Sequence, residues 1–182
     1  MTTHAEQGTS GDGRDAPAAS EQTPSAGPRL QVGDRFPTEA LVRSGAALLG
    51  PTVVYFYPKD GTETCTLEAA AFQREAARYR AAGVEVVGVS TDDDESHRCF
   101  ADEEGIGFRL VSDPDASLTT SVGALKDYGE FGELAARVTF LLDTEGTVRQ
   151  VFDVADDVTS HPAAVLAEAQ RLGLVPEGGP AA

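Results

Sequence analysis

The sequence predicts an α/β fold, in which helices flank a central mixed β-sheet. Two observations carry this prediction. Short apolar runs alternate with helix-length segments along most of the chain, and two strands around a Glu145-Gly146 turn come before the last helix. Strands that alternate with helices favour parallel neighbours, while a closing hairpin adds antiparallel ones. The expected order is therefore β-α-β-α-β-α-β-β-α.

The first strand and first helix have the clearest signals. Residues 52–57 (TVVYFY) form a continuous apolar run, which is typical of a central strand covered on both faces. A helix is predicted over residues 64–82, because apolar residues recur there every seventh position and so share one face. These residues are Cys65, Phe72 and Tyr79, with Ala69 and Ala76 beside them. Gly83 is placed to end the helix.

The middle of the chain repeats the alternation. Residues 84–90 (VEVVGVS) read as a second buried strand, and residues 108–113 (FRLVSD) as a third. Between them, residues 91–105 predict a short helix with acidic residues at its N-terminus, where the helix dipole favours them. The next helix, within residues 113–123, is expected to begin with Asp113 as N-cap and Pro114 in its first turn.

The end of the predicted domain is a hairpin followed by a helix. Residues 138–153 predict two strands. Ser160 is placed to cap a helix that has Pro162 in its first turn and runs to Leu172.

The chain predicts one folded domain with a tail at each end. Its 182 residues are enough to bury a sizeable core. Residues 1–28 contain no Val, Ile, Leu or Phe, so they cannot bury enough apolar area to offset their ordering entropy and are expected to be a disordered acidic tail. The domain is expected over residues 29–175, with a flexible tail over residues 176–182.

The charge balance disfavours some partners. The formal net charge is −16, and a surface this acidic repels phosphate backbones and anionic lipid heads, so neither nucleic acid nor membrane is expected as a partner. Thirty acidic residues with only two lysines resemble proteins of salt-rich cytoplasm, although an acidic coding bias gives the same composition. No signal-peptide core and no run of about 18 apolar residues is present, so a cytoplasmic location is expected.

Cysteine and histidine usage predicts neither a disulfide scaffold nor a metal site. The two cysteines, Cys65 and Cys99, do not form a CxxC pair, and the three histidines are scattered at positions 4, 97 and 161. No cofactor is expected.

Cys65 is the candidate nucleophile. It lies in the predicted first turn of a helix, where unpaired N–H groups and the helix dipole favour a thiolate, the reactive form of the thiol. From position alone, a small buried apolar role is the alternative, as it is for most lone cysteines.

The neighbours of Cys65 add a resemblance. The pattern Pro58-x-x-x-Thr62-x-x-Cys65 resembles the active-site motif of peroxiredoxins, which are thiol peroxidases of the thioredoxin-like fold. Further segments match in order, and the resemblance covers about residues 30–172. The matching segments are VGDRFP, YFYPKDGTETCTLEAAAF, GVEVVGVSTDD, LVSDPD and ARVTFLLDTEGTV. The second of these is similar to Q-type members, also called bacterioferritin comigratory proteins.

The resemblance implies a role for each matching residue. Cys65 corresponds to the peroxidatic cysteine, which reduces hydrogen peroxide or organic hydroperoxides and becomes a sulfenic acid. Thr62 corresponds to the threonine that contacts the sulfur and the peroxide, and Pro58 to the proline that shields the site. Arg137 corresponds to the arginine that reaches the same pocket, although without the family it reads as an exposed ion-pairing residue.

Two positions depart from the family pattern. Glu63-Thr64 replaces the usual Pro-Gly, which places an extra carboxylate beside the nucleophile. Ala70 stands where many Q-type members carry the resolving cysteine. Cys99 is then the remaining candidate, with polar helical neighbours that predict an exposed thiol and with Phe100 pointing inward. The alternative is a one-cysteine enzyme that relies on an external thiol.

The implied partners are a hydroperoxide and a thioredoxin-like or other thiol reductant, with the chain a monomer or weak homodimer. A non-catalytic thioredoxin-fold binding module is the competing interpretation. It would keep the core and lose the motif, yet Pro58, Thr62, Cys65 and Arg137 are all present.

Overall fold

The structure is a computed structural model that describes residues 27–154 and 157–175. Five strands form one sheet in the order β3-β2-β1-β6-β7. They are β1 (Thr52–Phe56), β2 (Glu85–Ser90), β3 (Arg109–Ser112), β6 (Val138–Leu142) and β7 (Val148–Asp153). β1 is parallel to β2 and antiparallel to β6, so the predicted mixed sheet is confirmed.

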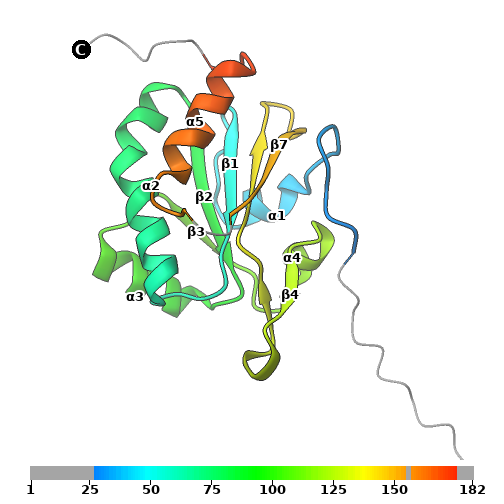
Figure 1. The fold of residues 1–182 in the computed structure, drawn as a ribbon, viewed down its shortest axis with the longest axis vertical. Coiled ribbons are helices and arrows are strands. Elements are labelled where there is room, and N and C mark those ends of the chain that lie inside the picture. The colour runs from blue at the N-terminus through cyan, green and yellow to red at the C-terminus, as the bar shows by residue number, and fades with distance from the viewer. Residues whose placement is uncertain (1–26, 155–156, 176–182) are drawn as a thin grey trace, which may run out of the picture.

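Helices cover both faces of this sheet. Figure 1 shows α2 (Glu63–Ala81), α3 (Asp94–Glu104) and α5 (His161–Arg171) on one side, and α1 (Thr38–Arg43) and α4 (Ser117–Ser121) on the other. β1 is buried along its whole length, as a central strand must be when both faces are covered. Val54 and Phe56 pack toward the α1 and α4 side, whereas Val53 and Tyr55 pack toward α2 and α5.

The long helix α2 has the buried face that its sequence predicts. Cys65, Ala69, Phe72, Ala76 and Tyr79 are all buried, and the helix bounds differ from the predicted ones by one residue at each end. It ends where predicted, because Gly83 takes a left-handed conformation (φ 71°) and the amide of the next residue, Val84, donates to the Tyr79 carbonyl at 2.9 Å.

The start of α4 corrects one prediction. Asp113 and Pro114 lie before the helix, which begins at Ser117 with Ala116 as its N-cap residue. The Asp113 carboxylate nevertheless accepts hydrogen bonds from the amides of Leu118 at 3.1 Å and Thr119 at 2.7 Å. Asp113 therefore satisfies N–H groups of the helix from the preceding loop, and the sequence placed the acceptor correctly and the helix boundary wrongly.

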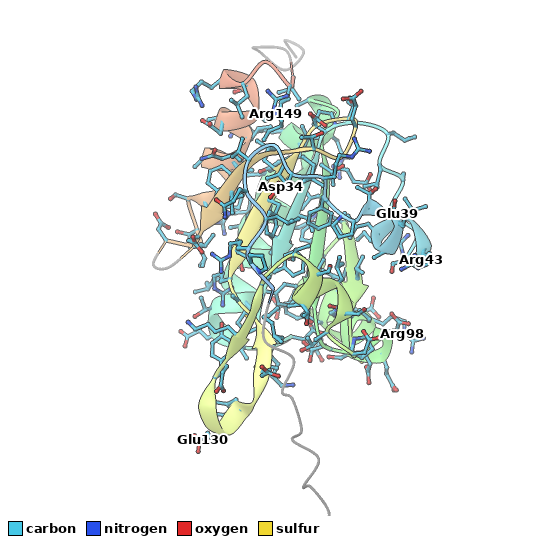
Figure 2. All side chains as sticks on the ribbon, turned by 90° about the vertical axis from the view of Figure 1, so that its right-hand side faces the viewer. Asp34, Glu39, Arg43, Arg98, Glu130 and Arg149 are labelled. Atoms are coloured by element: carbon cyan, nitrogen blue, oxygen red, sulfur yellow. The ribbon has the colours of Figure 1, made fainter. Side chains whose placement is uncertain are left out.

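Other elements have no counterpart among the predicted ones. Helix α1 is absent from the prediction, as is a hairpin of β4 (Leu125–Asp127) and β5 (Glu133–Ala135) joined by a 3₁₀ turn over Gly129–Phe131. β4 and β5 are each three residues long, which is too short for an alternating pattern of apolar and polar residues to identify them. Figure 2 shows Glu130 at the tip of this hairpin, which projects from the body of the domain.

The predicted tails fall largely beyond the described residues. Residues 1–26 and 176–182 lie outside them, so the domain boundaries at 29 and 175 stay predictions. Within the described part, Arg29 pairs with Asp153 and the Leu30 amide donates to the Val122 carbonyl at 3.1 Å, so this end of the chain is attached to the domain.

Candidate active site

Cys65 lies in the first turn of α2, three residues after the N-cap Thr62. Its side chain is buried, with 1% of the residue exposed. Cys65 is a free thiol. The unpaired N–H groups and the dipole at a helix start favour negative charge, and so offset part of the cost of burying a charged sulfur there.

Arg137 contacts Cys65 although the two residues lie far apart in the sequence. One of its terminal guanidinium nitrogens (Nη2) lies 3.3 Å from the Cys65 sulfur. The strand register explains this contact. Val138, the first residue of β6, pairs with Phe56, the last residue of β1, so the residue before β6 stands beside the loop that leads into α2. The structure thus joins two residues that are 72 positions apart in the sequence.

Glu68 is a third member of the site that the sequence analysis did not identify. It accepts an ion-paired hydrogen bond from Nη1 of Arg137 and is completely buried. Burial raises the pKa of Glu68 to about 7, against the opposing charge of Arg137. The signal in the sequence was its spacing, because residues three apart on a helix share a face and Glu68 is three after Cys65. One guanidinium therefore bridges a carboxyl group and the sulfur.

Two aromatic hydroxyls border this arrangement. Burial raises the pKa of Tyr55 well above its usual value, and the nearby Glu68 and Cys65 add to the shift. Among the residues that the structure describes, the Tyr55 hydroxyl has no hydrogen-bond partner. Tyr128 is half-buried and donates to the Ala135 carbonyl at 3.4 Å, while burial raises its pKa and the charge of Arg137 opposes the rise. Both hydroxyls thus remain protonated donors at neutral pH.

Pro58 and Thr62 lie in the loop between β1 and α2. Pro58 is half-buried, and Thr62 is exposed. The Thr62 hydroxyl donates to the Lys59 carbonyl at 3.0 Å and makes no capping bond within α2. In this arrangement the Thr62 side chain is directed back into its own loop, so contact with a bound peroxide would require the hydroxyl to turn.

Cys99 lies outside the contacts that join Cys65, Arg137 and Glu68. It is exposed on α3, whereas its helix neighbours His97 and Phe100 are buried. The predicted orientation of this helix is therefore confirmed, with Phe100 inward and Cys99 outward. The structure brings together Cys65 and Arg137 and leaves Cys99 at the surface as a free thiol.

Within residues 27–154 and 157–175, no group of three or more His, Cys, Asp or Glu side chains is arranged to hold a metal ion. None of the helices in this part of the chain combines the length and the apolar composition needed to cross a bilayer.

Comparison with family models identifies the protein family to which this chain belongs. The AhpC/TSA family model matches residues 38–151, which include Cys65, Glu68 and Arg137. The chain belongs to the AhpC/TSA family. This membership confirms the predicted peroxiredoxin-type, thioredoxin-like fold.

Curated relatives in this family are Q-type peroxiredoxins. The chain is 42% identical over 103 residues to the chloroplastic peroxiredoxin Q of Sedum lineare, a match that covers 57% of this chain and 54% of the relative. It is 37% identical over 122 residues to that of Triticum aestivum, covering 67% and 55%. The chain thus spans about half the length of the curated relatives it matches.

Solved structures of the family have the same architecture. The bacterioferritin comigratory protein of Xanthomonas campestris aligns with a TM-score of 0.63 at 36% identity, over 68% of this chain and 80% of that one. A cysteine-to-serine mutant of Xylella fastidiosa PrxQ aligns with a TM-score of 0.71 at 25% identity, over 81% and 99%. The Q-type resemblance seen in the sequence is confirmed by these neighbours.

Proposed function

We propose that this protein is a thiol peroxidase that reduces hydrogen peroxide and organic hydroperoxides with Cys65 as nucleophile. The observation that carries the proposal is the guanidinium of Arg137, held 3.3 Å from the buried Cys65 sulfur at the start of α2. The Xanthomonas campestris relative is described as having alkyl peroxide reduction activity, and that substrate class is consistent with this site.

The reaction follows from the arrangement of charge. The Cys65 thiolate attacks the terminal peroxide oxygen, an S–O bond forms as the O–O bond breaks, and the leaving oxygen takes a proton to become water or an alcohol. Negative charge moves from sulfur to the leaving oxygen during this step. A fixed cation beside that path stabilises the transition state more than the ground state, which is the role assigned to Arg137.

Glu68 holds Arg137 in place in this proposal. Its ion pair occupies Nη1 of the guanidinium and leaves Nη2 directed at the sulfur. A planar fork with two parallel donors suits this bridging position better than the single ammonium of lysine would.

The second half of the cycle removes the sulfenic acid. We assign Cys99 as the candidate resolving thiol, since Ala70 occupies the alternative position, and an external thiol is the other route. Either thiol would attack the Cys65 sulfur to give a disulfide and water. Because Cys99 is exposed and Cys65 buried, an internal disulfide requires part of α3 or the start of α2 to open.

Two variants test the proposal. Cys65→Ser should abolish peroxide consumption in the presence of an added dithiol, whereas Cys99→Ser, the matched cysteine substitution, should retain it. Substantial turnover by Cys65→Ser would remove the central assignment. If the wild-type protein folds but does not reduce peroxide, the non-catalytic binding module is favoured instead.

The reductant, the oligomeric state and the cellular location are further parts of the proposal. We propose a thioredoxin-like thiol reductant, a monomeric or weakly dimeric state and a cytoplasmic location. Size-exclusion chromatography with light scattering would measure the oligomeric state directly.

A further inference from the structure

A buried polar cluster joins the active-site loop to the helix that carries Cys99. We call it the Asp60–His97 cluster, and its members are Tyr57, Asp60, Ser96 and His97. The side chains of Asp60 and His97 are 6% and 5% exposed. Buried charges away from water must be paired and hydrogen-bonded, so a cluster of this kind fixes the segments that contribute to it.

Asp60 is the centre of the cluster. Its Oδ2 lies 2.7 Å from Nδ1 of His97 and accepts a hydrogen bond of 2.7 Å from the Ser96 hydroxyl. Its Oδ1 accepts another, also of 2.7 Å, from the Tyr57 hydroxyl. Three donors on one carboxylate form an arrangement in which each donor constrains the same side chain.

The backbone of the loop is held from the same direction. The Asp60 amide donates to Oδ2 of Asp92 at 2.8 Å, and the Ser90 hydroxyl donates to the same oxygen at 2.7 Å. The segment between β2 and α3 thus contacts the loop through Asp92, while α3 itself contacts it through Ser96 and His97.

The position of this cluster gives it a place in the reaction. Asp60 lies in the loop over residues 57–62, between Pro58 and the N-cap residue Thr62 of α2. His97 lies on α3, two residues before Cys99. Any opening that exposes Cys65 by moving this loop, or that turns Cys99 inward by unwinding α3, must break the Asp60–His97 contact.

We infer that Asp60 and His97 are positioning residues of this peroxidase, which lock the 57–62 loop to α3 and so control how readily the start of α2 opens. The inference rests on the proposed role of Cys65 and does not require Cys99 to be the resolving thiol. It makes loop and helix one cooperative unit, which opens together rather than as two independent segments.

The charge state of His97 sets the strength of the lock. Burial lowers the pKa of His97, but the hydrogen bond and charge of Asp60 outweigh it, and the nearby Val111 carbonyl and Asp92 add to the net rise in pKa. Burial likewise opposes the lowered pKa of Asp60, which donors from His97, Tyr57 and Ser96 bring about. The ion pair is therefore complete between the lowered pKa of Asp60 and the raised pKa of His97.

Other charged groups near His97 are screened by solvent. Asp93 and Asp94 at the start of α3, Arg98 on α3, Arg43 at the end of α1 and Arg109 at the start of β3 line the same open hollow as His97. All five are exposed. The lock weakens as pH rises through the folded-state pKa of His97, because neutral imidazole keeps only an uncharged hydrogen bond to Asp60.

Three substitutions separate this role from general packing. His97→Ala removes both charge and donor. His97→Asn places an amide N–H where Nδ1 stands, so it keeps a hydrogen bond to Asp60 without titrating. Lys59→Gln is the matched control, since it removes only the exposed ion pair of 3.3 Å between the same loop and Asp92.

The measurement is hydrogen exchange by mass spectrometry on the full reduced chain, expressed as protection factors for residues 59–66 and 94–104, with α5 as the internal reference. His97→Ala should lower protection in both segments together, on the order of a hundredfold, because it leaves a buried carboxylate without its cation. His97→Asn should recover most of this protection. Lys59→Gln should leave it within a few fold of wild type.

The pH profile supplies the readout that packing alone would not change. Wild-type protection of both segments should fall as pH rises above 6.5 and through the raised pKa of His97, while that of His97→Asn should stay flat. The inference is overturned if only residues 94–104 respond to His97→Ala, or if His97→Asn keeps the wild-type pH profile. If His97→Ala fails to fold, the comparison of wild type with His97→Asn still decides. None of these measurements depends on peroxidase activity, so the loss of the Cys65 assignment would be recognised separately.

Discussion

Replacement of Arg137 by glutamine should slow the reaction of Cys65 with peroxide on the order of a hundredfold. At 3.3 Å, a unit charge pair in an effective dielectric of about 20 interacts by ~5 kcal/mol. Arg137 retains some contact with solvent, its side chain being 13% exposed, which reduces this figure. Loss of one preorganised donor to a developing charge typically costs about 3 kcal/mol, which corresponds to a rate loss on the order of a hundredfold.

The loss has two sources that a second variant separates. Without the guanidinium, Glu68 is a buried carboxyl group with no cation, and burial then favours its neutral form. Glu68→Gln, alone and combined with Arg137→Gln, closes a double-mutant cycle that measures how much of the effect passes through Glu68.

The assay is stopped-flow measurement of the second-order rate constant for Cys65 oxidation, with Arg149→Gln as control. Arg149 forms an ion pair with Asp143 at 3.4 Å that is partly exposed, so its loss should leave the rate constant unchanged. If Arg137→Gln oxidised at the rate of Arg149→Gln, the guanidinium would have no part in transition-state stabilisation and the proposed mechanism would be refuted.

Four further measurements test other features of the molecule. Burial lowers the pKa of His161 from 6.5 to about 4, against the charge of Asp157. Below about pH 6.5 the unfolded chain binds a proton at this residue that the folded protein does not, so the free energy of unfolding should fall by roughly 3 kcal/mol as pH falls toward 4. Urea titrations of wild type and His161→Gln at several pH values measure this, and parallel profiles for the two would contradict it. Gly88→Ala should lower the free energy of unfolding by about 1–3 kcal/mol, because the new methyl group would lie 2.8 Å from Leu110 and 2.9 Å from Tyr55. An unchanged midpoint in thermal denaturation would disprove this clash. Intact-mass analysis after peroxide should show wild type two hydrogens lighter, whereas Cys99→Ser should gain oxygen at Cys65; oxygen adducts alone in wild type would make the enzyme one-cysteine. Deletion of residues 1–26 should leave activity and melting temperature nearly unchanged, because the segment lacks large apolar side chains, and a large drop in either would show that it docks.

Local pattern was enough to predict the scaffold around Cys65. The apolar run of β1 and the seven-residue spacing along α2 are written in consecutive residues, so the strand, the helix and the buried face that includes Cys65 could be predicted. The helix start could be predicted for the same reason, because the end of an apolar strand and the beginning of helical spacing meet within a few residues. The hairpin of β4 and β5 and the cap of α4 form between residues close in the sequence, but the patterns of these short elements are too brief to stand out.

Glu68 shows why the site itself was only partly predictable. A glutamate in the middle of a helix is expected to be exposed, since a lone carboxylate is costly to bury. It is buried here because Arg137, 69 positions away, supplies the compensating charge. The same reasoning applies to Asp60 and His97, because only the packing of α3 against the loop brings the two side chains together.

The sequence by itself determined the α/β alternation, the buried face of α2, the position of Cys65 at its start and the family motif around that cysteine, because each is encoded in the local order of residues. The tertiary structure decided which distant groups complete the site. Pairing of Phe56 with Val138 brings Arg137 to the Cys65 sulfur, and the packing of α3 brings His97 to Asp60. The physical reason is that charges are tolerated in a protein interior only in pairs, and the members of these pairs come from segments that sequence separation keeps apart and folding brings together.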